Sequence, residues 1–208
     1  MRAGDERRAN AAGDPVREAL PAEREALAAL LARAFASDPV YRWILPDDAR
    51  WQRSAPGVFR EILALFAATG LVLTDPSGGG VALWDPPERA RAFRARLAFA
   101  LRMCARLGRA SSRLAAVAGT LADFHPREPH WYLGVIGVEP EHQGRGIGTS
   151  LMAPLLDRCD AERLPAFLET ATPANLRFYK GRGFEVVGEA AVRGGPRVWA
   201  LRRAPRAG

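Results

Sequence analysis

Hydrophobic residues recur at helical spacing through the first part of the chain. Apolar positions at i, i+3, i+4, i+7 and i+8 predict a helix over Leu27–Phe35. This helix should end before Asp38, because the residue preceding a proline avoids the helical region. The same spacing predicts a second helix over Trp51–Phe66, and Gly70 is suited to end it. The early part of the chain is therefore predicted to be mainly helical.

Short apolar runs separated by turn residues predict strands around these helices. Pro15–Leu20 is expected to include a short strand. Leu71–Thr74 and Val81–Trp84 are two further strands, joined by a segment rich in Asp, Pro, Ser and Gly. The two runs therefore predict a hairpin with a loose turn.

Residues 86–124 are predicted to form one broken helix or two helices. Two apolar stripes support this: Phe93, Leu97, Ala100, Cys104 and Leu107, then Leu114, Val117, Leu121 and Phe124. Eight arginines occupy the remaining faces. A basic amphipathic segment can contact a membrane or nucleic acid, but a solvated face over packed apolar residues is the favoured interpretation.

The second half of the chain alternates between strand and helix and ends in two strands. The predicted elements are a buried strand Trp131–Val138, a helix Ile147–Ala161 kinked at Pro154, a strand Ala166–Thr170, a short helix N-capped by Thr172, and strands Phe184–Val187 and Arg197–Leu201. This order indicates a mixed α/β fold.

Length and composition favour one domain of a cytoplasmic protein. The 208 residues fit a single domain over 14–208 with a helical insertion at 86–124, preceded by a charged, Ala/Gly-rich segment 1–13 that is expected to be a disordered tail without a secretory signal. No apolar run is long enough to span a membrane. The two cysteines and three histidines lack the spacing of a metal site, so we expect no bound metal and reduced thiols.

The formal net charge of +7 comes almost entirely from arginine. Such an excess suits an anionic partner, either nucleic acid or a phosphate-bearing cofactor. An arginine-rich composition without any role in binding explains the charge equally well. Charge therefore does not decide the function.

The most informative segment is Gln143–Gly148, with sequence Gln-Gly-Arg-Gly-Ile-Gly. It lies between the strand ending at Val138 and the helix beginning near Ile147. A helix N-terminus offers free N–H groups and a partial positive charge, and glycines let a phosphate approach the backbone. Arg145 adds a fixed positive charge. The segment matches neither the dinucleotide-binding fingerprint nor a P-loop.

Gln143-x-x-Gly146-x-Gly148 resembles the Gln/Arg-x-x-Gly-x-Gly/Ala signature of the GNAT superfamily of N-acyltransferases, and Tyr179-Lys180-x-x-Gly183-Phe184 follows at the expected distance. Further segments resemble the puromycin N-acetyltransferase branch: Pro129–Leu133, Pro165–Thr170, Asn175–Tyr179 and Gly195–Trp199. The resemblance is specific from about Leu133 to Phe184. It implies a central twisted mixed sheet with splayed strands flanked by helices, and a helical insertion before the central strand.

The resemblance also implies how acetyl-CoA would bind. Gly134 and Gly137 are suited to a bulge in the central strand. The splayed strand would pair with pantetheine amides, and the N–H groups after it would hold the pyrophosphate. The implied cofactor-binding residues are Ile136, Gly137, Val138, Gln143, Gly144, Arg145, Gly146, Ile147, Gly148, Thr149, Asn175 and Tyr179.

The implied chemistry is direct attack of a neutral amine on the thioester, in a ternary complex. Tyr179 stands where the family places its general acid. Glu169, at the end of a strand facing the expected cleft, is the first candidate for the general base, and His125 and His130 are weaker candidates that could line the acceptor pocket. Many members carry asparagine where Thr172 stands here; Asn175 either replaces it toward the cofactor or stabilises its own helix.

The acceptor is expected to be a small primary amine, such as an aminonucleoside antibiotic in a resistance reaction. Trp43, Trp84, Trp131 and the 86–124 insertion would then close over it. A protein or peptide amine is the nearest alternative, and a basic nucleic-acid-binding module without catalysis is a remote one. We expect no membrane or nucleic-acid partner and either a monomer or a homodimer.

Overall fold

A seven-stranded mixed sheet organises the protein in the computed structural model, which describes residues 16–87 and 93–206. The predicted tail, 1–13, lies outside the described residues, as do five residues at the start of the predicted insertion. The strand order is β1-β2-β3-β4-β5-β7-β6. Neighbouring strands are antiparallel except for the central pair β4 and β5, which run parallel.

The elements follow the predicted order. The strands are β1 (Arg17–Glu18), β2 (Leu71–Thr74), β3 (Gly80–Asp85), β4 (Trp131–Val138), β5 (Ala166–Thr170), β6 (Glu185–Ala191) and β7 (Arg197–Arg203). The helices are η1 (Pro21–Glu23), α2 (Arg24–Ala34), α3 (Pro39–Ile44), α4 (Asp48–Thr69), α5 (Phe93–Leu107), η3 (Gly108–Ala110), α6 (Ser111–Phe124), η4 (Pro140–His142), α7 (Ile147–Glu162) and α8 (Pro173–Lys180).

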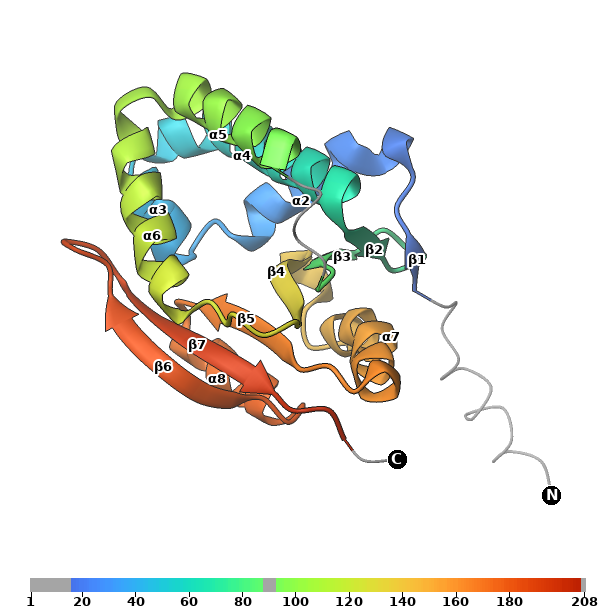
Figure 1. The fold of residues 1–208 in the computed structure, drawn as a ribbon. Helices are drawn as coiled ribbons and strands as arrows, with labels where there is room; N and C mark the ends of the chain where they lie inside the picture. Colours follow the sequence, from blue (N-terminus) through green and yellow to red (C-terminus); the bar gives the residue numbers. More distant parts are fainter. Residues whose placement is uncertain (1–15, 88–92, 207–208) are drawn as a thin grey trace.

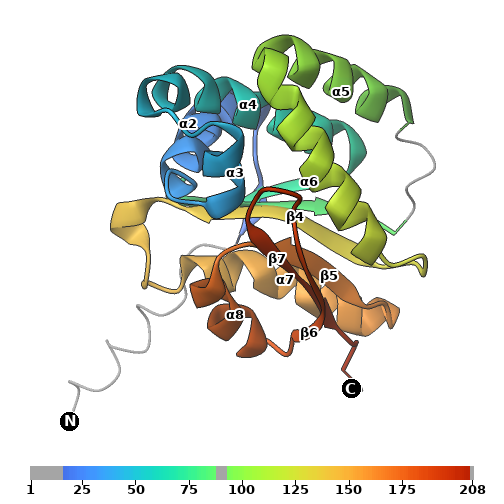
Figure 2. The same ribbon diagram turned by 90° about the vertical axis from the view of Figure 1, so that its left-hand side faces the viewer.

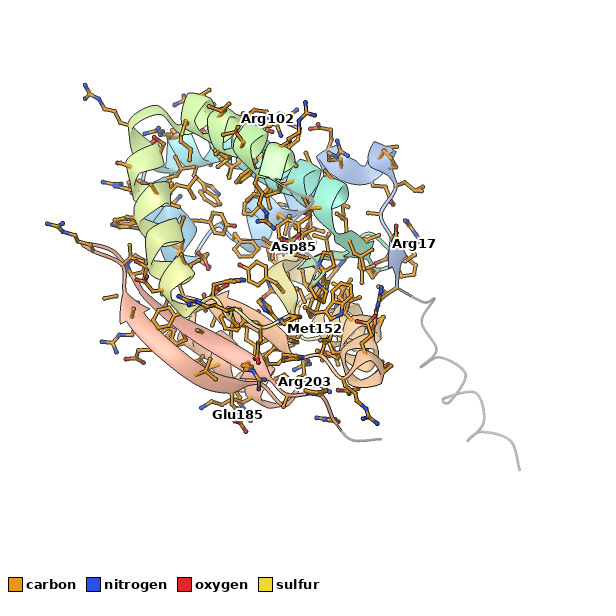
Figure 3. The ribbon with its side chains drawn as sticks, in the orientation of Figure 1. Arg17, Asp85, Arg102, Met152, Glu185 and Arg203 are labelled. Atoms are coloured by element: carbon orange, nitrogen blue, oxygen red, sulfur yellow. The ribbon has the colours of Figure 1, made fainter. Side chains whose placement is uncertain are left out.

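The helices form two layers of unequal thickness, one on each face of the sheet. Helices α2 to α6 cover one face, and α7 and α8 cover the other (Figures 1 and 2). Each layer has its own apolar core. In Figure 3, Asp85 lies on the side of α5 and Met152 on the side of α7. The sheet therefore separates a core made mostly by the first 124 residues from one made mostly by the later residues.

The central strands part halfway along their length. Strand β4 pairs with β5 only as far as Leu133 and Leu168, although β4 continues to Val138. The register between β3 and β4 shifts at Gly134, which confirms a bulge at one of the two predicted glycines. A Cβ at Gly134 would lie 2.3 Å from the Phe66 ring, so helix α4 packs directly on the bulge. The splay opens the sheet where β5 ends.

Two helical predictions need correction. Helix α3 was not predicted, yet Asp38 caps it by accepting hydrogen bonds from the N–H groups of Val40 and Tyr41, at 2.9 and 3.0 Å. The buried face of α5 is also different, because Leu97 is 51 % exposed and Met103 is buried instead. The predicted stripe was wrong for Leu97, Ala100 and Cys104, which are exposed, whereas Leu107 is buried as predicted. Residues 93–124 form two helices rather than one.

The arginines of this helical segment mostly have partners within the chain. Arg96 pairs with Asp85, Arg102 and Arg106 both pair with Glu61, and Arg113 donates to the Trp43 carbonyl at 2.8 Å. Figure 3 shows Arg102 on the outer side of α5. These contacts fit the favoured interpretation, a solvated charged face over packed apolar residues.

None of the helices in the described part of the chain is both long and apolar enough to cross a lipid bilayer.

Candidate active site

The loop Gln143–Gly148 joins β4 to α7 with an open backbone. Gly144 and Gly146 have positive φ values of 78° and 89°, and a Cβ at either position would meet no atom within 4 Å. Gly146 is the N-cap of the 16-residue helix α7. Gln143 donates from Nε2 to the Val138 carbonyl at 3.1 Å, which ties the loop to the end of β4. The result is a concave helix start open to an anion.

A cavity of about 630 Å³ lies beside this loop. Eleven of the twelve predicted cofactor residues line it: Ile136, Gly137, Val138, Gln143, Gly144, Gly146, Ile147, Gly148, Thr149, Asn175 and Tyr179. Arg145 is exposed and does not line it. The Thr149 N–H already donates to the Gly146 carbonyl at 2.9 Å, so the expected role of that N–H in holding phosphate is not supported.

Arg182, which the sequence did not single out, brings positive charge to this cavity. Its Cζ lies 3.5 Å from the centre of the Phe178 ring, and its guanidinium donates to the Thr149 hydroxyl. Burial lowers the pKa of Arg182, but the group remains a cation at neutral pH. The signal was its position inside the Tyr-Lys-x-x-Gly motif.

A second cavity, of about 420 Å³, lies on the other side of β4 under the helices of the first layer. Its walls are apolar and come mainly from α3, α4, α5 and α6, including Ile44, Val58, Ile62, Met103, Leu107 and Val117. Charged side chains enter it at three places: Asp38, Arg96 and Glu169. Such a cavity suits a molecule with an apolar body and few polar groups.

The two cavities share a short boundary. Five residues line both: Phe35, Asp38, Ile136, Asn175 and Tyr179. A ligand reaching from the glycine loop along β4 would therefore meet a molecule from the apolar cavity beside Tyr179. This boundary is the natural place for a reaction between two substrates.

Tyr179 is held at this boundary with 5 % of its surface exposed. Its ring packs edge-on against Phe178 and Phe184, at 5.2 and 6.0 Å between centres. Burial raises the pKa of the Tyr179 phenol, and the nearby Asp38 carboxylate adds to the rise. The phenol is therefore protonated at neutral pH and can donate.

Asp38 is a boundary residue that the sequence analysis missed. Besides capping α3, it faces the Thr172 hydroxyl at 3.5 Å across the site. Burial is the main cause that raises the pKa of its carboxyl, and the hydrogen bonds from Tyr41 and Val40 oppose the rise. The Asp-Pro pair was interpreted only as the end of α2, although it is also a typical helix start.

Glu169 projects from the end of β5 into the apolar cavity, where β4 and β5 have parted. Its side chain is 6 % exposed, and Oε1 is buried without a hydrogen-bond partner among the described residues. The nearest charged partner of Oε1 is the ring of His125, whose Nδ1 lies 3.8 Å away. A buried carboxylate in this state is costly unless a ligand or a proton satisfies it.

The three predicted tryptophans do not line either cavity. Trp84 is 0 % exposed and Trp131 2 %, both in the core on the far side of the sheet, where Trp131 donates to Glu162 at 2.7 Å. Trp43 packs against Gly195 and donates to the Gly194 carbonyl at 2.8 Å. Their assignment to the acceptor pocket is therefore corrected. Trp84 on β3 and Trp131 on β4 point away from the helices that build this pocket, because side chains alternate between the two faces of a strand. Trp43 on α3 is turned toward the loop between β6 and β7 instead.

No cluster of three or more metal-ligating side chains occurs within residues 16–87 and 93–206. Both cysteines are free: Cys159 is buried and Cys104 is exposed, the latter against the expectation of a packed thiol. Burial raises the pKa of the Cys159 thiol to about 12, so it remains protonated at neutral pH.

Comparison with known proteins decides the family. Residues 78–184, just over half of the chain, match the acetyltransferase (GNAT) family. The chain belongs to the GNAT family. The match covers the splayed strand β4, the glycine loop and Tyr179, the same features that form the two-cavity boundary.

Individual relatives agree with this assignment. An uncharacterized N-acetyltransferase of Schizosaccharomyces pombe is 30 % identical over 169 residues, covering 76 % of this chain and 68 % of the relative. A Corynebacterium glutamicum structure described as histone acetyltransferase HPA2 and related acetyltransferase has a TM-score of 0.69 at 25 % identity and covers 93 % of this chain and 97 % of its own. A mosquito protein described as arylalkylamine N-acetyltransferase like 5b shares only the fold, with a TM-score of 0.56 at 14 % identity and coverage of 91 % of this chain and 98 % of its own.

The protein is therefore an N-acetyltransferase with the mixed α/β GNAT fold. GNAT enzymes use acetyl-CoA as acetyl donor. The glycine loop fits such a donor for two reasons. Gly144 and Gly146 have open space where a side chain would project, and the loop leads into the N-terminus of helix α7, which favours a phosphate group.

Proposed function

We propose that the protein acetylates a small-molecule primary amine that carries an apolar body. The observation that carries this proposal is the boundary at Tyr179, where an apolar cavity of about 420 Å³ meets the cavity beside the glycine loop. The apolar body would lie among α3 to α6, and its amine would point to the boundary. Asp38 and Glu169 supply negative charge on that path, which favours an ammonium group over a neutral one.

Acetyl-CoA is the proposed donor, with its pyrophosphate at the N–H groups of Gly144–Gly148 and its pantetheine along the unpaired part of β4. Arg182 lies at the same cavity and suits the negative charge of the phosphates. The thioester then reaches Tyr179. This placement follows from the splay of β4 from β5, which leaves backbone groups beyond Leu133 without a partner on β5.

In the proposed reaction Glu169 accepts a proton from the amine and Tyr179 donates one to the departing thiolate. The amine nitrogen bonds to the thioester carbon, and the bond from that carbon to sulfur breaks. The low polarity that raises the pKa of Tyr179 also disfavours a free thiolate, so the proton moves to sulfur as charge develops there. Asn175 donates to the Thr170 hydroxyl at 3.5 Å and lines both cavities, which suits a role in shaping the boundary.

The apolar lining of this cavity favours a small acceptor over a protein amine. A peptide needs a long open groove, whereas helices α5 and α6 supply part of the walls of this cavity. An aminonucleoside such as puromycin is the first candidate, because its amine is attached to a methoxyphenyl-bearing residue that could enter an apolar space.

The test is release of free CoA thiol from acetyl-CoA with four acceptors: puromycin, 2-phenylethylamine, spermidine and a lysine-containing peptide. We expect turnover with one or both of the first two and none above background with the polar amines. Turnover confined to the peptide would contradict the small-acceptor proposal. Heat protection by acetyl-CoA, measured in parallel, tests the donor site separately.

A further inference from the structure

His125 lies beside Glu169, and His130 lies beside His125. Neither histidine lines either cavity. His125 follows the last residue of α6, and His130 directly precedes β4, so both lie where the helical segment returns to the sheet. The Nε2 atoms of the two rings are 3.1 Å apart, and the Nδ1 atom of His130 is 2.7 Å from the Glu128 carbonyl oxygen. His125 Nδ1 also lies 3.8 Å from Oε1 of Glu169, close but beyond hydrogen-bond distance, so the three side chains form a series of neighbouring groups.

The hydrogen-bond partners determine where the ring protons reside. A carbonyl oxygen only accepts, so Nδ1 of His130 must carry its proton. In a neutral ring the Nε2 atom of His130 then has a lone pair, and Nε2 of His125 must be the donor between them. Neutral His125 is thereby left with an unprotonated Nδ1 that faces the buried oxygen of Glu169.

This arrangement has one vacant proton position beside Oε1 of Glu169, a buried oxygen without a hydrogen-bond partner among the described residues. From it we infer that His125 is a positioning residue that takes over, at Nδ1, the proton which Glu169 removes from the amine, and that His130 fixes the His125 tautomer for this purpose. The inference rests on the proposed role of Glu169. Without this proton, His125 Nδ1 and Glu169 Oε1 are both acceptors; once Nδ1 is protonated it can donate to Oε1.

The surroundings hold the series in place and give it an exit. Phe167 packs edge-on against both histidine rings, at 5.4 and 5.7 Å between centres, and Tyr132 packs against His125 at 5.2 Å. Charged neighbours within the described residues include Glu169 on one side and, beyond His130, the ion pair of Glu128 and Arg202. The His125 side chain is 20 % exposed, so its proton can pass to solvent.

Protons balance over one turnover. The substrate ammonium gives one proton to Glu169, which passes it to His125. The neutral amine forms the carbon–nitrogen bond, the carbon–sulfur bond breaks, and Tyr179 protonates the sulfur. The surplus proton on the new amide nitrogen restores Tyr179, and His125 releases its proton to water. The net products are acetylated amine, free CoA and one proton.

Nitrogen-15 NMR of the histidine rings tests the inference without any substrate. The chain has only three histidines, so His142→Gln is enough to separate the remaining two signals from the third. In the neutral state we expect the proton of His130 on Nδ1 and that of His125 on Nε2. In His130→Phe the His125 ring should populate both tautomers. A His125 ring protonated at Nδ1 in the neutral wild type would overturn the inference.

Kinetics with 2-phenylethylamine give the second test. His125→Gln should lower kcat about tenfold, less than Glu169→Gln, and leave the KM for acetyl-CoA unchanged. The double variant should fall no further than Glu169→Gln alone, because both groups serve one proton path. Fully multiplicative losses would overturn the inference. If the wild type acetylates no amine, the acceptor proposal fails, and the NMR result still decides the proton arrangement.

Discussion

The two cavities that meet at Tyr179 are built from different parts of the polypeptide. The cavity of the proposed donor takes much of its shape from backbone: the part of β4 that is not paired with β5, two glycines with positive φ and the start of α7. The acceptor-side cavity takes its shape from ordinary apolar side chains on α3 to α6. A backbone site tolerates few substitutions and keeps one ligand, whereas a side-chain site can change its ligand through single replacements. The family's common donor and varied acceptors follow from this difference.

Tyr179→Phe is expected to have the largest effect, because it removes the proton donor that serves both cavities. We expect kcat to fall by about a hundredfold or more, and acetyl-CoA to protect the protein against heat as in the wild type. The ring, and with it the packing against Phe178 and Phe184, is preserved. Unchanged kcat in steady-state CoA release would exclude the phenol as the donor.

Gly146→Ala tests the backbone cavity alone. Alanine at φ 89° is strained and places a methyl group at the start of α7, so acetyl-CoA binding should weaken by about tenfold or more. Gly194→Ala is the matched control, because Gly194 has φ 68° and equally open surroundings but lies between β6 and β7.

Both glycine variants should lose about 1 kcal/mol of stability from backbone strain. Only Gly146→Ala should lose affinity in an acetyl-CoA titration. Equal loss in both would mean that the affinity change reflects general destabilisation and not the loop.

Val117→Trp tests the side-chain cavity. Val117 is buried on α6 and lines the acceptor cavity only, so a larger side chain should reduce the space for the apolar body and raise the KM for 2-phenylethylamine about tenfold. Acetyl-CoA affinity should not change. Val187→Trp, at an exposed valine of β6, is the matched control. A weaker acetyl-CoA affinity in Val117→Trp would show that the two cavities are not independent.

The same contrast explains what could be predicted from the sequence. The glycine loop and β4 were predictable, because helix starts, positive φ and buried strands each require particular residue types at fixed spacing. Tyr179 was identified only through the resemblance to the GNAT superfamily. The acceptor cavity was not, since Met103 and Val117 are residues that any core accepts, and only the folded chain brings four helices together around them. The tryptophan prediction was wrong for this reason: a large ring in a strand indicates burial but not which face of the sheet it occupies.

Asp38 was missed, and His125 and His130 were predicted only as separate weak candidates at the acceptor pocket, which they do not line, for a related reason. Asp38 carries a local signal, but that signal describes a helix cap and does not show the partner 134 residues away in Thr172. The link from His125 to Glu169 likewise depends on how the helical segment returns to the sheet. Contacts between distant segments leave no periodic pattern in one sequence.

The smallest effect is expected at the ion pair that anchors the helix of the donor cavity. Arg203 of β7 binds Asp160 of α7 through two hydrogen bonds of 2.7 and 2.6 Å, and this contact holds the pKa of Asp160 below its usual value. Because that pKa is lowered on folding, the pair stabilises the protein above the unfolded carboxyl pKa of about 3.9, and the stabilisation is lost as the pH falls through the folded value.

Asp160→Asn should therefore lower the melting temperature by about 2–4 °C at pH 7, and this difference should shrink as the pH falls through the lowered pKa of Asp160. The measurement is thermal unfolding of both proteins from pH 7 downward. The variant leaves the acceptor cavity intact, so the KM for 2-phenylethylamine should stay at its wild-type value at pH 7. A melting-temperature difference that stays constant down to the lowest pH at which both proteins fold would mean that the carboxylate charge does not stabilise α7.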